Sequence, residues 1–81
     1  MNTKDLYEVR FPRTILRFTV ELAGGMDILT VAKEAEGRAG ELMSSIPTKD
    51  GFYLTLVSAV EDSTQTKMFY TFDVIGVVIY V

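Results

Sequence analysis

The chain has 81 residues, a net charge of −3, and neither cysteine nor histidine. A chain of this length forms a single domain, here residues 1–81, and buries roughly 60% of its unfolded surface. The 48% share of apolar residues is that of a globular chain and excludes a disordered one. The missing cysteines exclude disulfides and Cys-ligated metals, and the missing histidines remove the commonest general base.

No targeting or membrane segment is predicted. The first five residues lack the basic and apolar pattern of a secretory signal. The longest apolar run, residues 74–81, is much shorter than the about 20 residues that a spanning helix needs. We therefore expect a cytoplasmic protein without membrane contact.

Charge is distributed unevenly along the chain. Residues 1–20 carry four basic and two acidic side chains, whereas the remainder carries four basic and nine acidic ones. This is a mild dipole, and it differs from the basic surface of a dedicated nucleic-acid-binding domain.

The first predicted elements are two strands within residues 6–22. Apolar and polar side chains alternate through residues 7–11 and again through residues 16–22, which is typical of half-buried strands. Pro12 cannot donate to a sheet ladder, so it marks a turn or bulge between the two strands. One long bent strand is the alternative.

A helix is predicted from about Asp27 to Ser45, after Gly24-Gly25. Asp27 suits the positive end of the helix dipole. Apolar residues at helical spacing predict one buried stripe: Ile28, Val31, Ala32, Ala35, Ala39, Leu42 and Ile46. Gly37 and Gly40 either weaken the second half of this helix, by about 1 kcal/mol each, or allow another element to approach closely.

Two strands are predicted after the helix. Pro47 ends the helix, and Asp50-Gly51 is a turn sequence that opens a strand at residues 52–60. Residues 61–66 form a polar connection to a last strand at residues 67–81. The predicted fold class is therefore α+β, with an antiparallel four-stranded sheet and a single helix packed on one face. The element order is ββαββ, or βαββ if the first two strands are one.

The sheet face opposite the helix is predicted to be apolar over the later strands. If Leu54 and Phe72 face the helix, alternation places a set of apolar side chains on the other face: Tyr53, Val57, Ala59, Ile75, Val77 and Ile79. An exposed apolar patch of this extent is rare on a monomer. We expect a protein interface formed by Tyr53, Val57, Ile75, Val77 and Ile79. A second copy, a foreign protein or the chain's own bent C-terminal strand could cover it.

An arginine-rich stretch is a second candidate surface. Arg10, Arg13 and Arg17 are interleaved with Phe11 and Phe18, a composition that can bind single-stranded nucleic acid. Alternation points Arg10 and Arg17 away from the aromatic side chains, so these arginines lack a stacking platform. A solvated sheet face or a protein contact explains the stretch better, and Arg13, at the tip of the predicted turn, is expected to be the most exposed of the three and able to anchor a protein interface.

No catalytic or metal site is predicted. The helix carries charges of both signs close together, which is typical of a solvated face with ion pairs: Lys33, Glu34, Glu36, Arg38 and Glu41. Glu61 and Asp62 lack metal-ligand spacing. The glycine pair before Asp27 fits a tight strand-to-helix turn better than a phosphate loop.

In element order alone, the chain is similar to two known designs. With two N-terminal strands it resembles the ubiquitin-like β-grasp, without the C-terminal Gly-Gly of a conjugated modifier. With one long N-terminal strand it resembles the small flavin-binding dodecins, without the tryptophan that stacks on the flavin. Neither resemblance implies a function.

The sequence therefore predicts a small, non-catalytic protein-binding domain that acts as a homo-oligomer and binds no cofactor. We expect an inhibitor, adaptor or accessory factor of the kind found in phage and mobile elements. One alternative is single-stranded nucleic-acid binding through the three arginines. Another is a small ligand held between sheets of an oligomer, near Tyr53, Phe69 and Tyr80.

Overall fold

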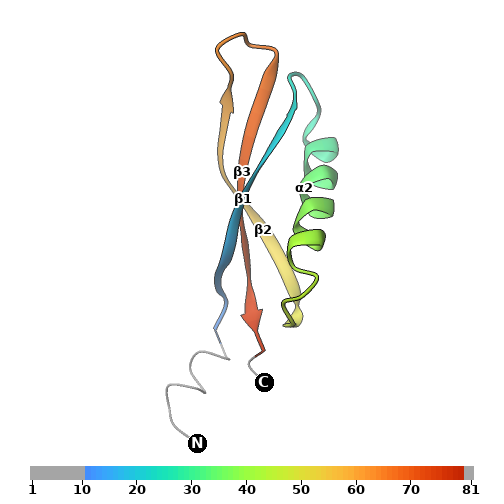
Figure 1. Cartoon of the computed structure of the whole chain (residues 1–81), viewed down its shortest axis with the longest axis vertical. Helices are drawn as coiled ribbons and strands as arrows, with labels where there is room; N and C mark the ends of the chain where they lie inside the picture. Colours follow the sequence, from blue (N-terminus) through green and yellow to red (C-terminus); the bar gives the residue numbers. More distant parts are fainter. Residues whose placement is uncertain (1–10, 80–81) are drawn as a thin grey trace, which may run out of the picture.

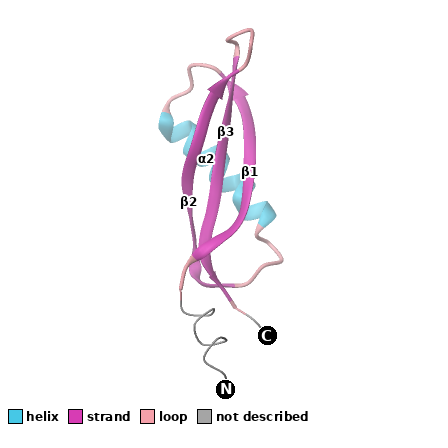
Figure 2. Cartoon of the chain, turned by 90° about the vertical axis from the view of Figure 1, so that its left-hand side faces the viewer, coloured by secondary structure: helices cyan, strands magenta, loops and turns pink. Residues whose placement is uncertain are grey.

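A computed structural model describes residues 11–79. These residues form one helix and three strands: β1 (Arg13–Ala23), α2 (Ile28–Leu42), β2 (Thr48–Glu61) and β3 (Lys67–Val78). The sheet is antiparallel, and β3 lies between β1 and β2. In Figure 1 the chain rises through β1, descends through α2 and returns through the β2–β3 hairpin. Figure 2 shows α2 crossing one face of the sheet obliquely.

The α+β class is confirmed, with a difference in strand number. Residues 11–79 form a sheet of three strands where four were predicted, and the strand predicted at residues 7–11 lies almost wholly outside the described range. Within that range the order is βαββ. Pro12 directly precedes β1, where its missing N–H breaks no ladder bond.

Local chemistry determines where α2 begins. The Asp27 carboxylate accepts a hydrogen bond of 2.8 Å from the Thr30 backbone N–H, which satisfies one of the free donors of the first turn. This bond lowers the pKa of the Asp27 carboxyl. The helix ends at Leu42, earlier than the predicted Ser45, and residues 43–45 form a turn.

The core is one layer of side chains between α2 and the sheet: Phe18, Val31, Ala35, Ala39, Met43, Phe72 and Val74. Phe18 and Phe72 are opposite each other in the β1–β3 register, and their rings stack with centroids 5.7 Å apart. The buried positions of the helix recur every fourth residue, because α2 crosses a narrow sheet (Figure 2). Ile28, which was predicted to lie in the buried stripe, is therefore 67% exposed.

The predicted turn at Asp50-Gly51 is instead an interruption within β2. Lys49 and Phe52 pair with adjacent residues of β3, and the two residues between them have φ angles of 63° and 80°. The interruption brings the Gly51 carbonyl oxygen against Gly76 of β3. A Cβ added to Gly76 would lie 3.2 Å from that oxygen, so only glycine fits there without rearrangement.

A second register shift in β2 occurs between Leu56 and Ser58. The extra residue, Val57, shifts the alternation of the residues that follow. Ala59 consequently pairs with Tyr70, whose side chain packs against the core. The prediction that Ala59 lies on the face away from the helix is therefore wrong.

Candidate functional site

The candidate interface lies on the sheet face that α2 leaves uncovered, called the bare face below. Figure 2 shows this face toward the viewer, with α2 behind the sheet. Residues opposite each other in the strand register share a face, so the register divides the bare face into rows across the strands. Apolar rows occupy the two ends, and polar rows lie between them.

The first apolar row contains Tyr53 of β2 opposite Ile75 of β3. Tyr53 is 57% exposed, whereas Ile75 is half-buried. Val77 follows on the same face of β3, opposite Lys49, and is also half-buried. Ile79 lies just beyond the strand and is 41% exposed. Four of the five predicted interface residues are thus close to one another at this end of the sheet.

Val57, the fifth predicted interface residue, is separate from this row. It occupies the β2 bulge, has no opposite residue on β3, and is 43% exposed. The sequence pattern could not distinguish Val57 from Tyr53, because a bulge changes the pairing of the strands and leaves no mark in the alternation of apolar residues.

The second apolar row contains Val60 of β2 opposite Phe69 of β3. Val60 is 57% exposed and Phe69 is 36% exposed. Strict alternation from Tyr53 would direct Val60 toward the helix, and the bulge reverses this. Val60 is therefore an interface candidate that the sequence reasoning missed.

Polar rows separate the two apolar ones. Arg17 is opposite Asp73, and its guanidinium donates two hydrogen bonds to the carboxylate, from Nε at 2.7 Å and from Nη2 at 3.1 Å. In the next row the Thr19 and Thr71 hydroxyls share a hydrogen bond of 2.9 Å. Ser58 continues this row on β2. The bare face thus carries two apolar patches separated by a polar band.

The ion pair between Arg17 and Asp73 shifts the pKa values of both side chains. The hydrogen bond from Arg17, reinforced by its charge, lowers the pKa of the Asp73 carboxyl, and the same contact raises the pKa of Arg17. The Asp73 side chain is only 13% exposed, against 60% for Arg17. The positive charge of Arg17 is therefore already paired within the chain.

The three candidate arginines do not form one described surface. Arg10 lies outside the described residues. Arg13 is exposed and begins β1, so it is not at the tip of a turn. Phe18 is buried in the core, on the opposite face from Arg17. Phe18 therefore offers no exposed ring beside Arg17 on which a base of single-stranded nucleic acid could stack.

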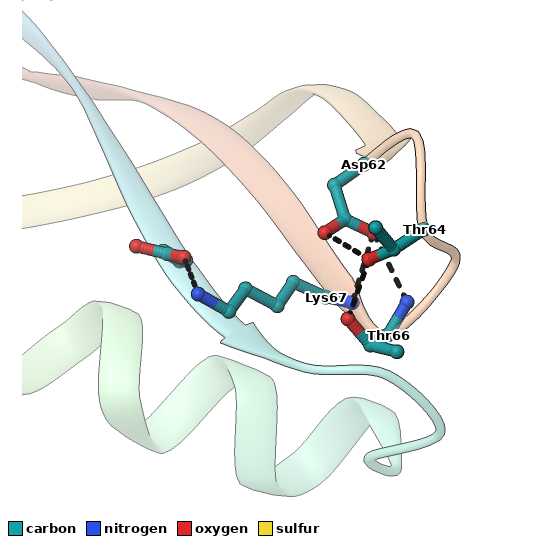
Figure 3. Close-up of polar contacts among 5 residues, drawn as sticks. Asp62, Thr64, Thr66 and Lys67 are labelled. Atoms are coloured by element: carbon teal, nitrogen blue, oxygen red, sulfur yellow. Dashed lines mark hydrogen bonds and ion pairs between the residues drawn. The ribbon is translucent and has the colours of Figure 1, made fainter.

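A polar network organises the β2–β3 connection (Figure 3). The Asp62 carboxylate accepts hydrogen bonds from the backbone N–H groups of Thr66 at 3.0 Å and Lys67 at 3.2 Å. It also accepts one from the Thr64 hydroxyl at 2.8 Å, and this bond contributes most to the lowered pKa of Asp62. The Lys67 ammonium forms an ion pair of 2.8 Å with Glu21, which joins the hairpin to β1. A structural role thus accounts for Asp62.

A groove runs between β1 and α2. It is lined by residues 19–22 of β1 and by one side of the helix: Lys33, Glu34, Gly37, Arg38 and Glu41. Gly37 leaves it wide, because no atom lies within 4 Å of a Cβ built at this position.

Among residues 11–79, no three acidic side chains are arranged to hold a metal ion. No helix in that range is long and apolar enough to cross a membrane.

Comparison with known proteins returned no match to this chain among protein families, curated proteins or solved structures.

Proposed function

We propose that this chain is a small, non-catalytic domain that binds protein surfaces through its bare face and assembles with further copies of itself. One observation carries this proposal: large apolar side chains lie exposed on a sheet face that no helix or strand within residues 11–79 covers. Tyr53 and Val60 are each 57% exposed there. Removing such side chains from water contributes about 25 cal/mol per Å² of apolar surface to association.

The layout of the bare face supports protein recognition. Tyrosine is enriched among the residues that dominate binding energy, because one side chain supplies both apolar area and a hydroxyl. Tyr53 lies in one apolar patch, and Phe69 lies in the other. The Thr19 and Thr71 hydroxyls between the patches can hydrogen-bond a partner and so add specificity. Protein interfaces typically combine buried apolar side chains with polar groups that hydrogen-bond the partner.

The proposal includes the absence of catalysis. The chain has no histidine or cysteine to act as base or nucleophile. Two of its carboxylates, those of Asp62 and Asp73, bond to groups of the fold itself. Such a domain would act as an inhibitor, adaptor or accessory factor in the cytoplasm.

Light scattering coupled to size-exclusion chromatography tests the proposal at two protein concentrations. We expect the wild-type chain to have a mass that is a multiple of its 9.1 kDa. Tyr53→Lys and Val60→Lys should each lower that mass, because a charge would enter an apolar contact. Leu29→Lys is the matched control: it also changes an exposed apolar residue, at 74% exposure, but on α2.

The circular-dichroism melting curves of the three variants should resemble that of the wild type, since all three positions are exposed. A wild-type chain that is monomeric at both concentrations would contradict self-association. An oligomer that keeps its mass in both sheet variants would show that the bare face is not the contact.

A further inference from the structure

One edge of strand β1 is unpaired among the described residues, and the pairing of β1 with β3 is regular from Leu16 onward. Strand β1 pairs with β3 on one side, and no strand within residues 11–79 pairs with its other side. The backbone N–H and C=O groups of such an edge can pair with an added strand. The β1–β3 register is continuous from Leu16 to Ala23. The other edge strand, β2, is interrupted at Asp50-Gly51 and at Val57, and such bulges hinder edge pairing.

The bare-face side chains of β1 are self-complementary about Thr19. Arg17 and Glu21 lie on the same face as Thr19, at equal distances before and after it. When two copies of a strand pair antiparallel, residues equidistant from the centre are opposite each other. Centring on Thr19 therefore places Arg17 of each copy against Glu21 of the other. On the helix-facing side it brings apolar residues together: Phe18 with Val20, and Leu16 with Leu22.

We propose that two copies of this chain pair along their β1 edges, antiparallel and centred on Thr19, so that both sheets form one continuous sheet. Antiparallel pairings centred on a residue next to Thr19, or two positions from it, give less favourable charge contacts. Centring on Arg17 would oppose two guanidinium groups, and centring on Glu21 would oppose two carboxylates. Centring on Phe18 or Val20 would leave both charges opposite uncharged residues.

Ion pairs already present in each copy extend this complementarity. Arg17 is bonded to Asp73, and Glu21 is bonded to Lys67. The Arg17 and Glu21 side chains are still 60% and 50% exposed, so each has accessible atoms for a second partner. Pairing therefore joins the two internal ion pairs into a line of alternating charge across the central strands. Opposite charges in direct register stabilise neighbouring strands.

On the helix side of the sheet, a groove borders the β1 edge. The groove between β1 and α2 runs along residues 19–22, the segment that would pair. Gly37 carries no side chain into this groove. Both bare faces would lie on the same side of the joined sheet, since Arg17 and Glu21 meet there. The edge contact is thus distinct from the contacts under the proposed function, and the joined sheet would leave Tyr53 and Val60 accessible.

Single-cysteine variants test the register, because the natural chain has no cysteine. Opposed residues in an antiparallel pair have Cα atoms about 4.5–5.5 Å apart, within the range of a disulfide. We expect Thr19→Cys to form a disulfide-linked dimer under mild oxidation. In this register the two copies of Glu21→Cys would be about 13 Å apart along the strands, too far to link. Equal linking of both variants, or no linking of Thr19→Cys, would overturn the register.

Charge reversal tests the pairing itself in solution. Arg17→Glu opposes two acidic side chains, and Glu21→Arg opposes two basic ones, so each variant alone should lose the edge dimer. A mixture of both variants restores opposite charges at both contacts between the two β1 strands and should regain a dimer in light scattering. A mixture of two folded variants that stays dissociated would overturn the proposal. Tyr53→Lys combined with Thr19→Cys should still link, which separates failure of the edge from failure of the bare face.

Discussion

Strand β3 contributes alternate residues to two faces that differ in what covers them. Phe72 and Val74 point toward α2, and they are 7% and 0% exposed. Their neighbours in the strand, Thr71 and Asp73, point to the bare face and bond to polar residues of β1. Phe69 lies on that same face and is 36% exposed. The single helix covers Phe72 and Val74 of β3, whereas Leu56 of β2, opposite Phe72 on the same face, is 45% exposed. On the bare face, the polar side chains of the middle rows bond one another. The exposed apolar side chains at its two ends are the candidate contact sites.

The largest expected difference between the faces is between two phenylalanines of β3. Phe72→Ala removes a buried ring that stacks on Phe18, so we expect a loss of about 3–5 kcal/mol of unfolding free energy. Phe69→Ala makes the same chemical change on the bare face and should cost much less in the dissociated chain. Denaturant unfolding at low protein concentration measures both values. Similar losses would show that the two faces are equally covered.

An intermediate effect is expected at Gly76, on the helix side of β3. Gly76→Ala places a Cβ 3.2 Å from the Gly51 carbonyl oxygen and 3.4 Å from the Phe52 Cβ. This overpacking should cost about 1–3 kcal/mol. Gly40→Ala is the control of opposite sign, because its Cβ meets no atom within 4 Å and alanine favours a helix by about 1 kcal/mol. Thermal unfolding of both variants measures the difference, and two shifts of the same sign would contradict the close approach at Gly76.

The smallest expected effect is the pH response of the bare face. Hydrogen bonding to Arg17 lowers the pKa of Asp73, so the folded state binds a proton here less readily than the unfolded state. The resulting stability is present above the ordinary carboxyl pKa, about 3.9, and is lost as the pH falls through the lower folded value. Asp27 and Asp62 act in the same direction. Asp73→Asn should lower the melting temperature at neutral pH and converge with the wild type in acid. A constant difference across that range would contradict this account.

The sequence was informative where the physical signal is local. Alternation identified the strands, and Asp27 and Pro47 bounded the helix within a few residues. The two shifts in β2 were not predictable in this way. Asp50-Gly51 reads as a turn sequence, whether it ends a strand or bulges within one. The bulge at Val57 leaves no sign in the sequence, yet it places Ala59 on the face opposite to the one predicted and directs Val60 to the bare face.

The middle of the candidate site depended on distant pairing. Asp73 and Arg17 are 56 residues apart in sequence, and no local pattern indicates that their side chains meet. Their contact follows from β3 lying between β1 and β2, an order that hydrophobic alternation does not specify. For this reason the sequence pattern did not indicate the polar band that separates the patch around Tyr53 and Ile75 from the second patch at Val60 and Phe69.

The central position of β3 also has a consequence for how the molecule forms during synthesis. Every strand pair of the described sheet includes β3, and β3 is made after β1, α2 and β2. A growing chain that has reached Glu61 therefore contains two strands without a neighbour and a helix without a sheet. Pairing must wait for the residues after Lys67. The β2–β3 hairpin then closes locally, whereas the β1–β3 pair joins residues as far apart as Arg17 and Asp73, 56 positions, and such long-range closure slows folding. Assembly of the described sheet is accordingly a late event, and until β3 is made no strand within residues 11–79 pairs with either side of β1.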